Sequence, residues 1–185
     1  MRACFMGLGY IGLPTAIIAA KHGIDVIGVD INKEVVETTN EGRLHIIEPG
    51  LESLLKDVVT NGKLKAYTEP QICDAYFIVV PTPFKGDHEP DISYVEAATR
   101  MVIPLLKPND LFVIESTSPV GTTEKMMNLI YETRPELKDL IYIAYCPERV
   151  LPGNVIYELE NNDRVIGGIN EASTEKAKEF YSIFV

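Results

Sequence analysis

The sequence is poor in the residues that disulfide frameworks, zinc sites and membrane spans require. Its 185 residues include no tryptophan and only three cysteines, Cys4, Cys73 and Cys146, which stand far apart in apolar runs. This spacing suits reduced thiols, and without a CxxC pair or a Cys/His cluster we predict no metal site. No apolar run approaches the roughly 18 residues that a membrane span needs, and a glycine cluster begins at Gly7, too early for a signal peptide. We therefore expect a soluble, cytoplasmic protein with no membrane partner.

Basic residues are scarce relative to acidic ones. There are 17 Lys and Arg against 27 Asp and Glu, so the formal net charge is −10. This excess of negative charge repels phosphate backbones and disfavours a nucleic-acid partner. The sequence also has no internal repeat and no Gly/Ser linker, and its length is that of roughly one large domain. We therefore predict a single domain over residues 1–185.

Short apolar runs alternate with segments of helical period, which is the pattern of βαβ units around a parallel sheet. We predict a Rossmann-type α/β fold, a doubly wound parallel sheet with helices on both faces. Strands are expected at Arg2–Met6, Asp25–Val29, Lys65–Tyr67, Ala75–Val80, Leu111–Glu115, Ile141–Tyr145 and Arg164–Gly167. Helices are expected after the glycine cluster and at Asn32–Asn40, Glu48–Asn61, Ser93–Leu106, Thr122–Thr133 and Ser173–Phe184, with hydroxyl residues capping the fourth and fifth.

A glycine-rich loop follows the first strand and opens the first helix. Residues 7–12 read G-x-G-x-x-G, with Gly7, Gly9 and Gly12 at the three glycine positions. In this context the glycines allow a tight turn, close approach of a pyrophosphate and close packing of helix on strand. The helix N-terminus offers unpaired amides to phosphates, and we expect Tyr10 and Ile11 to donate them. The alternative is a glycine turn that binds no dinucleotide.

The second strand ends in an acid, Asp30, eighteen residues after Gly12. A carboxylate here can accept hydrogen bonds from both hydroxyls of an adenosine ribose and would repel a 2′-phosphate, so NAD is favoured over NADP. The alternative is that Asp30 caps the next helix, a role that Asn32 also suits. Lys33 either flanks the adenosine ribose or is a solvated surface cation.

Hydroxyl residues gather after the fourth and fifth predicted strands. Thr82 stands between two prolines, which stiffen the chain and leave its hydroxyl as a fixed polar group toward the ribose or nicotinamide. The alternative is a rigid turn without a ligand. In the stretch ESTSPVGTT, helix capping and turn formation explain most residues but not Thr117. Thr117 is therefore a candidate to hold a water or a substrate hydroxyl near the nicotinamide.

One acid and one base follow the sixth predicted strand, in the stretch CPERVLPGN. Glu148 is a candidate acid/base or water-orienting carboxylate, and Arg149 a candidate phosphate-binding residue. The alternative is an exposed acid and base of little energetic value. Spacing alone does not choose between them.

Four motifs together are similar to a known family. GLGYIGLP, VVPTP, ESTSPVGTT and CPERVLPGN, in this order and spacing, resemble the N-terminal half of the UDP-glucose/GDP-mannose dehydrogenase family. Such enzymes oxidise the C6 alcohol of a nucleotide sugar to a carboxylate by two NAD-dependent hydride transfers. The sequence NDRVIGG after PERVLPGN points within the family to the branch that acts on UDP-N-acetyl-D-mannosamine. The resemblance thus implies a UDP-sugar substrate and NAD as cofactor.

The resemblance assigns roles position by position. On the adenosine and pyrophosphate site it places Gly7, Gly9, Tyr10, Ile11, Gly12 and Asp30. It places Thr82 and Thr117 toward the nicotinamide, Glu148 as the acid that manages a water or proton, and Arg149 and Val150 in the segment that contacts substrate. Thr117 and Glu148 are accordingly the predicted catalytic residues. UDP-glucose enzymes have a second glutamate where this chain has Pro152, which cannot act as an acid.

Parts of the family's catalytic machinery have no counterpart in this sequence. The family uses a cysteine in its C-terminal half, a lysine and an asparagine from a central helix, and it dimerises through the central domain. We expect residues 1–185 to be the NAD-binding domain alone, without the central and C-terminal UDP-binding domains, inactive by itself and dimeric only with the central domain. The alternatives are a dinucleotide-binding module without catalysis, a UDP-glucose 6-dehydrogenase, and a β-hydroxyacid dehydrogenase, whose NADP-selective Asn-Arg pair is replaced here by residues 30–32.

Overall fold

A seven-stranded sheet forms the centre of the molecule. The computed structural model describes residues 1–151 and 153–185. The strand order is β3-β2-β1-β4-β7-β8-β9, and every pair is parallel except β8 with β9. The chain builds outward from β1 in one direction and then, from β4, in the other. The predicted doubly wound α/β fold is thereby confirmed.

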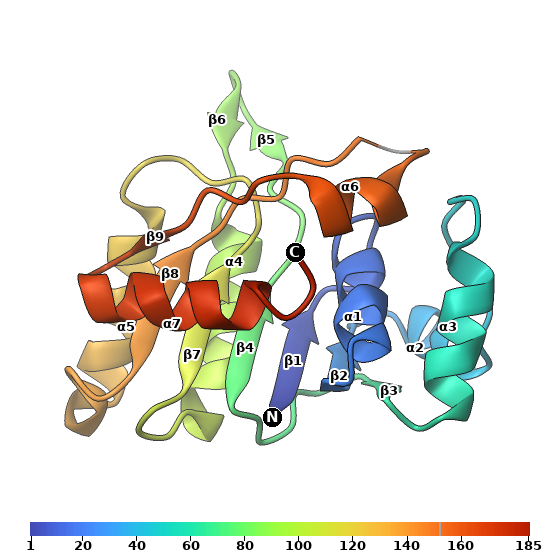
Figure 1. The fold of residues 1–185 in the computed structure, drawn as a ribbon. Coiled ribbons are helices and arrows are strands. Elements are labelled where there is room, and N and C mark those ends of the chain that lie inside the picture. The colour runs from blue at the N-terminus through green and yellow to red at the C-terminus, as the bar shows by residue number, and fades with distance from the viewer. Residues whose placement is uncertain (152) are drawn as a thin grey trace.

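Strands alternate with helices along much of the chain (Figure 1). The strands of the main sheet are β1 Arg2–Met6, β2 Asp25–Val29, β3 Leu64–Tyr67, β4 Ala75–Ile78, β7 Leu111–Ile114, β8 Tyr142–Tyr145 and β9 Gly167–Gly168. The helices are α1 Gly12–Lys21, α2 Lys33–Asn40, α3 Leu51–Thr60, α4 Ser93–Val102, α5 Thr122–Thr133, α6 Val155–Asn161 and α7 Glu171–Tyr181. A small hairpin of β5 Phe84–Lys85 and β6 Glu89–Pro90 projects beyond the carboxyl ends of the strands (Figure 1).

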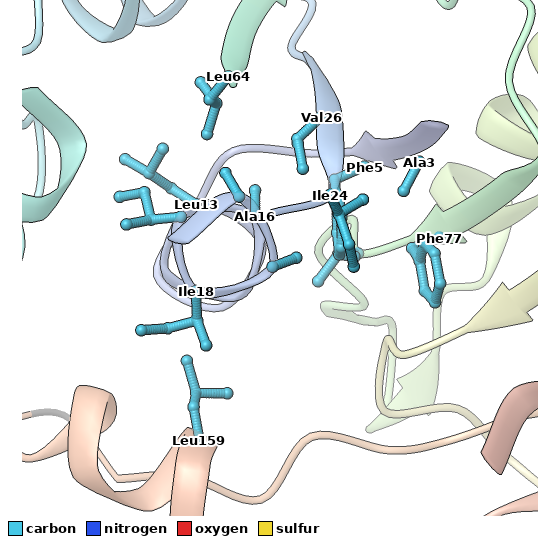
Figure 2. Close-up of a cluster of buried hydrophobic side chains, with 14 of the residues drawn as sticks. Ala3, Phe5, Leu13, Ala16, Ile18, Ile24, Val26, Leu64, Phe77 and Leu159 are labelled. Carbon is cyan, nitrogen blue, oxygen red and sulfur yellow. The ribbon is translucent and has the colours of Figure 1, made fainter. Parts of the chain in front are cut away.

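Two apolar clusters cover the two faces of the sheet. In β1, Phe5 points into the cluster formed with α1, α3, α6 and α7, whereas Cys4 points into the cluster formed with α4 and α5. Phe5 stacks on Phe77 of β4 with ring centroids 4.7 Å apart. Figure 2 looks along α1, where Ile18 points toward Leu159 of α6. Because α1 is buried almost all round, it is fixed at the centre of the fold.

Some local predictions were wrong. The seventh strand was expected at Arg164–Gly167, but the strand is Gly167–Gly168 and antiparallel to β8. Arg164 stands before it because its side chain is buried in an ion pair. Hydroxyl capping was also wrong, since the amide of Ser93 bonds Asp91 and the Thr122 hydroxyl donates to the Pro119 carbonyl. Helix α6 and the β5–β6 hairpin were not predicted.

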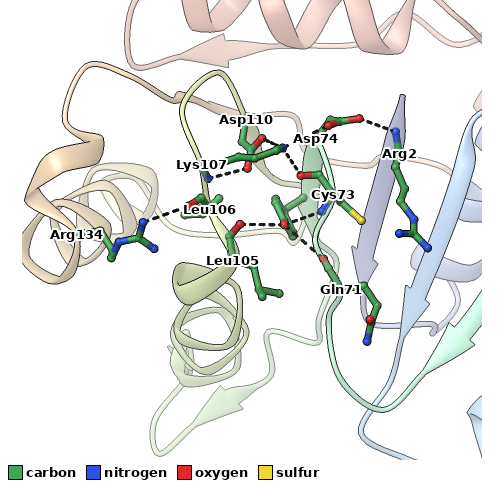
Figure 3. Close-up of polar contacts among 10 residues, drawn as sticks. Arg2, Gln71, Cys73, Asp74, Leu105, Leu106, Lys107, Asp110 and Arg134 are labelled. Carbon is green, nitrogen blue, oxygen red and sulfur yellow. Dashed lines mark hydrogen bonds and ion pairs between the residues drawn. The ribbon is translucent and has the colours of Figure 1, made fainter.

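Polar contacts tie the amino ends of three neighbouring strands together (Figure 3). Before β4, the Asp74 carboxylate accepts from the backbone N–H of Arg2 at 2.9 Å. Before β7, Lys107 donates to the Cys73 carbonyl at 2.8 Å and forms an ion pair with Asp110, whose side chain is buried. Burial raises the pKa of Asp110. This end of the sheet is thus closed by structural ion pairs.

Two features are absent from residues 1–151 and 153–185. None of the helices there combines the length and the apolar character that crossing a membrane requires. Nor do three His, Cys, Asp or Glu side chains in this part of the chain gather closely enough to hold a metal ion.

Candidate cofactor site

A cavity of about 300 Å³ lies beyond the carboxyl ends of β1, β4 and β7. Strand order reverses between β1 and β4, and open parallel sheets bind their ligands at such a point. The cavity is lined by Gly7, Gly9, Tyr10, Ile11, Asp30, Val79, Val80, Pro81, Thr82, Glu115, Ser116, Thr117 and Glu148. The structure therefore brings together eight of the predicted site residues, from five separate segments of the chain.

Two of the three loop glycines are required by close packing of backbone. Gly7 has φ +105°, and a Cβ there would lie 2.4 Å from the Val79 carbonyl oxygen. A Cβ on Gly12 would lie 2.0 Å from the Gly7 carbonyl oxygen. At Gly9, by contrast, a Cβ would meet no atom within 4 Å. The loop is thus pressed against β4 at one side and leaves Gly9 facing open space, where a ligand can approach the backbone.

The N-terminus of α1 faces this open space with unpaired donors. Tyr10 and Ile11 immediately precede the helix. Ile11 is the N-cap, and its side chain forms no capping hydrogen bond with the amides of the first turn. Among the described residues, neither amide donates a hydrogen bond to another backbone carbonyl. These N–H groups and the positive end of the helix dipole suit an anionic group such as a pyrophosphate.

Asp30 connects the glycine loop to the start of α2. One of its carboxylate oxygens accepts from the Leu8 amide at 3.1 Å, and the other accepts from the Asn32 amide at 2.9 Å. Asn32 is the N-cap of α2, because its side chain accepts from the amide of Glu34. The capping alternative for Asp30 was therefore wrong. Each oxygen of Asp30 uses one lone pair, which leaves acceptor capacity for hydroxyl groups in the cavity.

The segment between α2 and α3 forms hydrogen bonds to two loops, the glycine loop and the loop after β8. His45 forms a hydrogen bond of 2.8 Å from Nε2 to the Leu8 carbonyl. Three residues later, the buried carboxylate of Glu48 accepts from the amides of Gly153 and Val155, both at 2.9 Å. One segment thereby joins the glycine loop to the loop after β8, although more than a hundred residues separate the partners of Glu48 from it.

The hydroxyl side chains at the other end of the cavity are held by the loops that carry them. Ser116 donates to the Val80 carbonyl at 2.7 Å, which fixes the loop after β7 to the loop after β4. This contact places Thr117 and Thr82 together on the cavity wall. Thr117 is exposed, so its hydroxyl is available to a ligand.

Glu148 is held by three hydrogen bonds. Its Oε1 accepts from the amides of Arg149, at 2.7 Å, and Val150, at 3.2 Å. Its Oε2 forms an ion pair with Arg164, and the two side chains are only 6% and 7% exposed. The alternative of an exposed acid is thus wrong for Glu148, which is a buried, anchored carboxylate at the cavity wall.

A second acid, Glu115, lies directly behind this wall. It follows β7, is 1% exposed and accepts a 2.6 Å hydrogen bond from the Tyr181 hydroxyl. Burial raises the pKa of Glu115 to about 7, against the opposing effect of nearby Arg164. The Arg164 guanidinium carbon stands 5.1 Å from the centre of the Tyr181 ring. The far end of the cavity is therefore backed by two carboxyls that share one arginine as their charged neighbour.

The family resemblance is confirmed by comparison with known proteins. Residues 1–185 match the UDP-glucose/GDP-mannose dehydrogenase family, NAD binding domain. The chain belongs to this family. It is an NAD-binding domain, so the prediction of NAD as cofactor is confirmed. The cavity fits that cofactor, because its glycine loop, free helix amides and Asp30 match the pyrophosphate and adenosine ribose of a dinucleotide.

Among the members of the family that this chain matches are enzymes for N-acetylated sugars. The UDP-N-acetyl-D-mannosamine dehydrogenase of Escherichia coli (strain K12) is 53% identical over 188 residues, which cover 97% of this chain and 45% of that protein. The NDP-N-acetyl-D-galactosaminuronic acid dehydrogenase of Ralstonia nicotianae is 50% identical, with 97% and 44% covered. The structure of the UDP-N-acetyl-mannosamine dehydrogenase Cap5O from Staphylococcus aureus superimposes with a TM-score of 0.96 at 41% identity, covering 100% of this chain and 46% of that one. The chain thus spans less than half the length of these relatives.

The cysteine near the cavity of this family member is not poised for nucleophilic chemistry. Cys146 is fully buried, and burial together with the neighbouring charge of Glu115 raises its pKa to about 12. The nearby guanidinium of Arg149 donates to the Asp163 carbonyl at 2.5 Å. The thiol therefore stays protonated at neutral pH.

Four predicted site residues do not line the cavity. Gly12 serves the packing behind the loop. Lys33 and Arg149 are exposed, and the Val150 side chain is 8% exposed and packs into the core. Their roles toward cofactor or substrate stay predictions. Pro152, expected from sequence to replace an acid, lies outside the described residues.

Sequence reasoning missed Glu115, Arg164 and Tyr181. Glu115 stood in a quoted motif, and the signal available was an acid placed directly after four fully apolar strand residues. Arg164 was assigned to a strand because apolar, β-branched residues follow it. Nothing local marked Tyr181, which reaches the site only because α7 packs across β7 and β8.

Proposed function

We propose that this chain is the NAD-binding part of a nucleotide-sugar 6-dehydrogenase that oxidises UDP-N-acetyl-D-mannosamine to the corresponding uronate. The observation that carries the proposal is the single cavity that joins the glycine loop and Asp30 at one end to Thr117 and Glu148 at the other. Two relatives named for N-acetylated sugars, at 53% and 50% identity, support an N-acetylated sugar over glucose. The sugar half of the site is proposed to come from the central and C-terminal domains of the family, and dimerisation from the central domain.

The glycine-loop end holds the adenosine half of NAD in this proposal. The amides of Tyr10 and Ile11 donate to the pyrophosphate, and Gly9 gives it access to the backbone. Asp30 accepts from the ribose hydroxyls while its existing bonds to the amides of Leu8 and Asn32 keep it in place. Lys33, exposed at the start of α2, flanks this ribose.

The far end of the cavity is where the chemistry is proposed to occur. When bound, NAD accepts a hydride at its nicotinamide ring, and each of the two oxidations releases protons. Thr82 contacts the nicotinamide side, and Thr117 orients a water or the sugar hydroxyl through its exposed hydroxyl. Glu148 orients a water or transfers a proton, and the segment of Arg149 and Val150, whose amides are bonded to Glu148, contacts the substrate. We propose a cytoplasmic location for this reaction.

Binding of dinucleotide to this chain tests the cofactor half of the proposal. Titration calorimetry should give measurable affinity for NAD and weaker affinity for NADP, whose 2′-phosphate meets the Asp30 carboxylate. Asp30→Asn should raise the Kd for NAD about tenfold or more, since hydrogen bonds to a charged acceptor are lost. It should also reduce the difference in affinity between NAD and NADP. No binding of either dinucleotide at millimolar concentration would refute the proposal.

The sugar assignment is tested on the longest reading frame that contains this sequence. NADH formation is followed at equal concentrations of UDP-N-acetyl-D-mannosamine, UDP-N-acetyl-D-galactosamine and UDP-glucose. The first sugar should be oxidised fastest, with two NADH formed per sugar. Preference for the second would match the Ralstonia relative, and preference for the third would assign the chain to a UDP-glucose enzyme. Either result overturns the proposed substrate and keeps the NAD site. Residues 1–185 alone should oxidise none of the three.

A further inference from the structure

Glu115 is a carboxyl at the cavity that neither the family resemblance nor the proposed mechanism uses. It stands at the carboxyl end of β7, between the strand and the loop that carries Thr117. Its backbone carbonyl accepts from the Glu148 amide at 3.3 Å, so the two acids are adjacent. One side-chain oxygen is bonded to the Tyr181 hydroxyl at 2.6 Å, and the other, within the described part of the chain, has no hydrogen-bond partner.

The groups that face Glu115 come from three other segments, which are the end of β8 with the loop after it, the segment before β9, and α7. Arg164 is the neighbouring cation that lowers the pKa of Glu115 against burial, and it is already hydrogen-bonded to Glu148. Tyr181 comes from α7 and Cys146 from the end of β8, and the pKa of each is raised above its ordinary value, so both are uncharged at neutral pH. The local charge at this end of the cavity therefore depends on whether Glu115 carries a proton.

Burial favours the neutral form of Glu115, and Arg164 favours the charged form. The two effects leave the pKa of Glu115 at about 7. At neutral pH a modest change in the local electrostatic potential is therefore enough to make the carboxyl gain or lose a proton. Oxidised nicotinamide carries a positive charge that the reduced ring lacks. A carboxyl backing the wall of the proposed nicotinamide end feels that difference more strongly than an exposed one, because little solvent screens it.

We propose that Glu115 is a proton-exchanging residue of this cavity, which is ionised when a dinucleotide with the oxidised, positively charged nicotinamide ring is bound and takes up a proton when the reduced, uncharged ring replaces it. The inference rests on the proposed placement of the nicotinamide near Thr117 and Glu148. In the oxidation, the hydride moves to the nicotinamide and removes its positive charge, and the alcohol releases a proton. Uptake of one proton by Glu115 then removes the negative charge that the ring no longer balances.

The test compares the affinities of this chain for NAD and NADH across pH. As pH rises from about 6 to about 8, Glu115 loses its proton, so the ratio Kd(NADH)/Kd(NAD) should increase, by about tenfold if the two cofactor states differ by about one unit in their effect on its pKa. In Glu115→Gln the ratio should stay constant with pH. Groups at the adenosine end, such as His45 beside Leu8, lie near a part of the cofactor that NAD and NADH share. Their effects on the two Kd values are therefore equal and cancel in the ratio.

Asp110→Asn is the matched control. Asp110 and Glu115 flank the same strand β7, both are buried, and burial raises the pKa of both, but Asp110 stands at the opposite end of the sheet. The Asp110 variant should keep the pH dependence of the ratio. The proposal is overturned if Glu115→Gln keeps that dependence as well, or if the parent chain shows none. Absence of binding by both dinucleotides would instead refute the proposed function itself.

A measurement on the unchanged sequence covers the case in which Glu115→Gln does not fold. Calorimetric titrations near pH 7 in buffers of different ionisation enthalpy report the protons released or taken up on binding. NAD should release a fraction of a proton from Glu115, and NADH should release less or none. Equal proton release by the two forms would overturn the proposal without any variant.

Discussion

The two ends of the cavity are built in different ways. At the glycine-loop end, the functional groups are backbone amides and one carboxylate, and all of them lie within residues 7–32. At the far end, they are side chains from β7, the loop after β8, the segment before β9 and the end of α7, joined by an arginine shared between two acids. The first end is set by steric demands on the backbone, whereas the second is set by electrostatic balance among buried groups.

This difference predicts how each end responds to substitution. A closely packed backbone loop is destabilised when a side-chain atom is added, because carbonyl groups such as that of Val79 cannot move aside. A buried ion pair destabilises the fold when one charged side chain is removed, because its partner is left charged and desolvated. The same distinction applies to pH. Rising pH ionises Glu115, so the far end should respond to pH near neutrality.

The largest effect is expected at the glycine-loop end. Gly7→Ala places a Cβ 2.4 Å from the Val79 carbonyl oxygen at a residue with φ +105°. Strain and overpacking together should lower the free energy of unfolding by about 4 to 6 kcal/mol. Chemical denaturation followed by circular dichroism measures the loss.

Gly9→Ala is the matched control, since its Cβ meets no atom within 4 Å. This variant should fold as the parent does and bind NAD about tenfold more weakly, because the added methyl stands where a pyrophosphate would approach. A stable Gly7→Ala protein, or a Gly9→Ala protein with unchanged affinity, contradicts the steric account of this end.

A smaller loss of stability is expected at the far end from Arg164→Met. The change keeps much of the apolar stem but leaves Glu148 without its ion-pair partner in a site where both side chains are less than a tenth exposed. The free energy of unfolding at pH 8 should fall by about 3 kcal/mol. The loss should shrink as the pH is lowered, because Arg164 also stabilises the charged form of Glu115, and that contribution disappears once Glu115 is protonated below its pKa of about 7.

Arg149→Met removes a neighbouring arginine that is exposed and contacts only a backbone carbonyl among the described residues. Its melting temperature should stay within about 2 °C of the parent. If the two variants lose equal stability, or if the loss from Arg164→Met is independent of pH, the far end is not held by charge balance.

The same contrast explains how far the sequence alone could predict this molecule. The positions of the first six strands of the main sheet, the glycine loop and Asp30 follow from local patterns, since each depends on residues that are close in the chain. The placement of Thr117 and Glu148 at one cavity follows from the rule that parallel strands end at the same edge. Arg164 could not be found this way, because its partner Glu148 is sixteen residues away across a loop and a helix, and an isolated arginine before an apolar run looks like a strand start. Tyr181 depends on where α7 packs, which no local pattern encodes.

The smallest expected effect concerns Lys33, for which the sequence left two interpretations open. Lys33 is the first residue of α2, is exposed and does not line the cavity, although Asn32 beside it is tied to Asp30. If it flanks the adenosine ribose, Lys33→Ala should weaken NAD binding about two- to threefold at low salt and less at high salt, because an exposed charge is screened. Glu34→Ala, one residue along the same helix turn, is the control and should leave the affinity unchanged at both salt concentrations. Equal affinities for the Lys33 variant and the parent at low salt would make Lys33 a surface cation and confine the adenosine end to the backbone amides and Asp30.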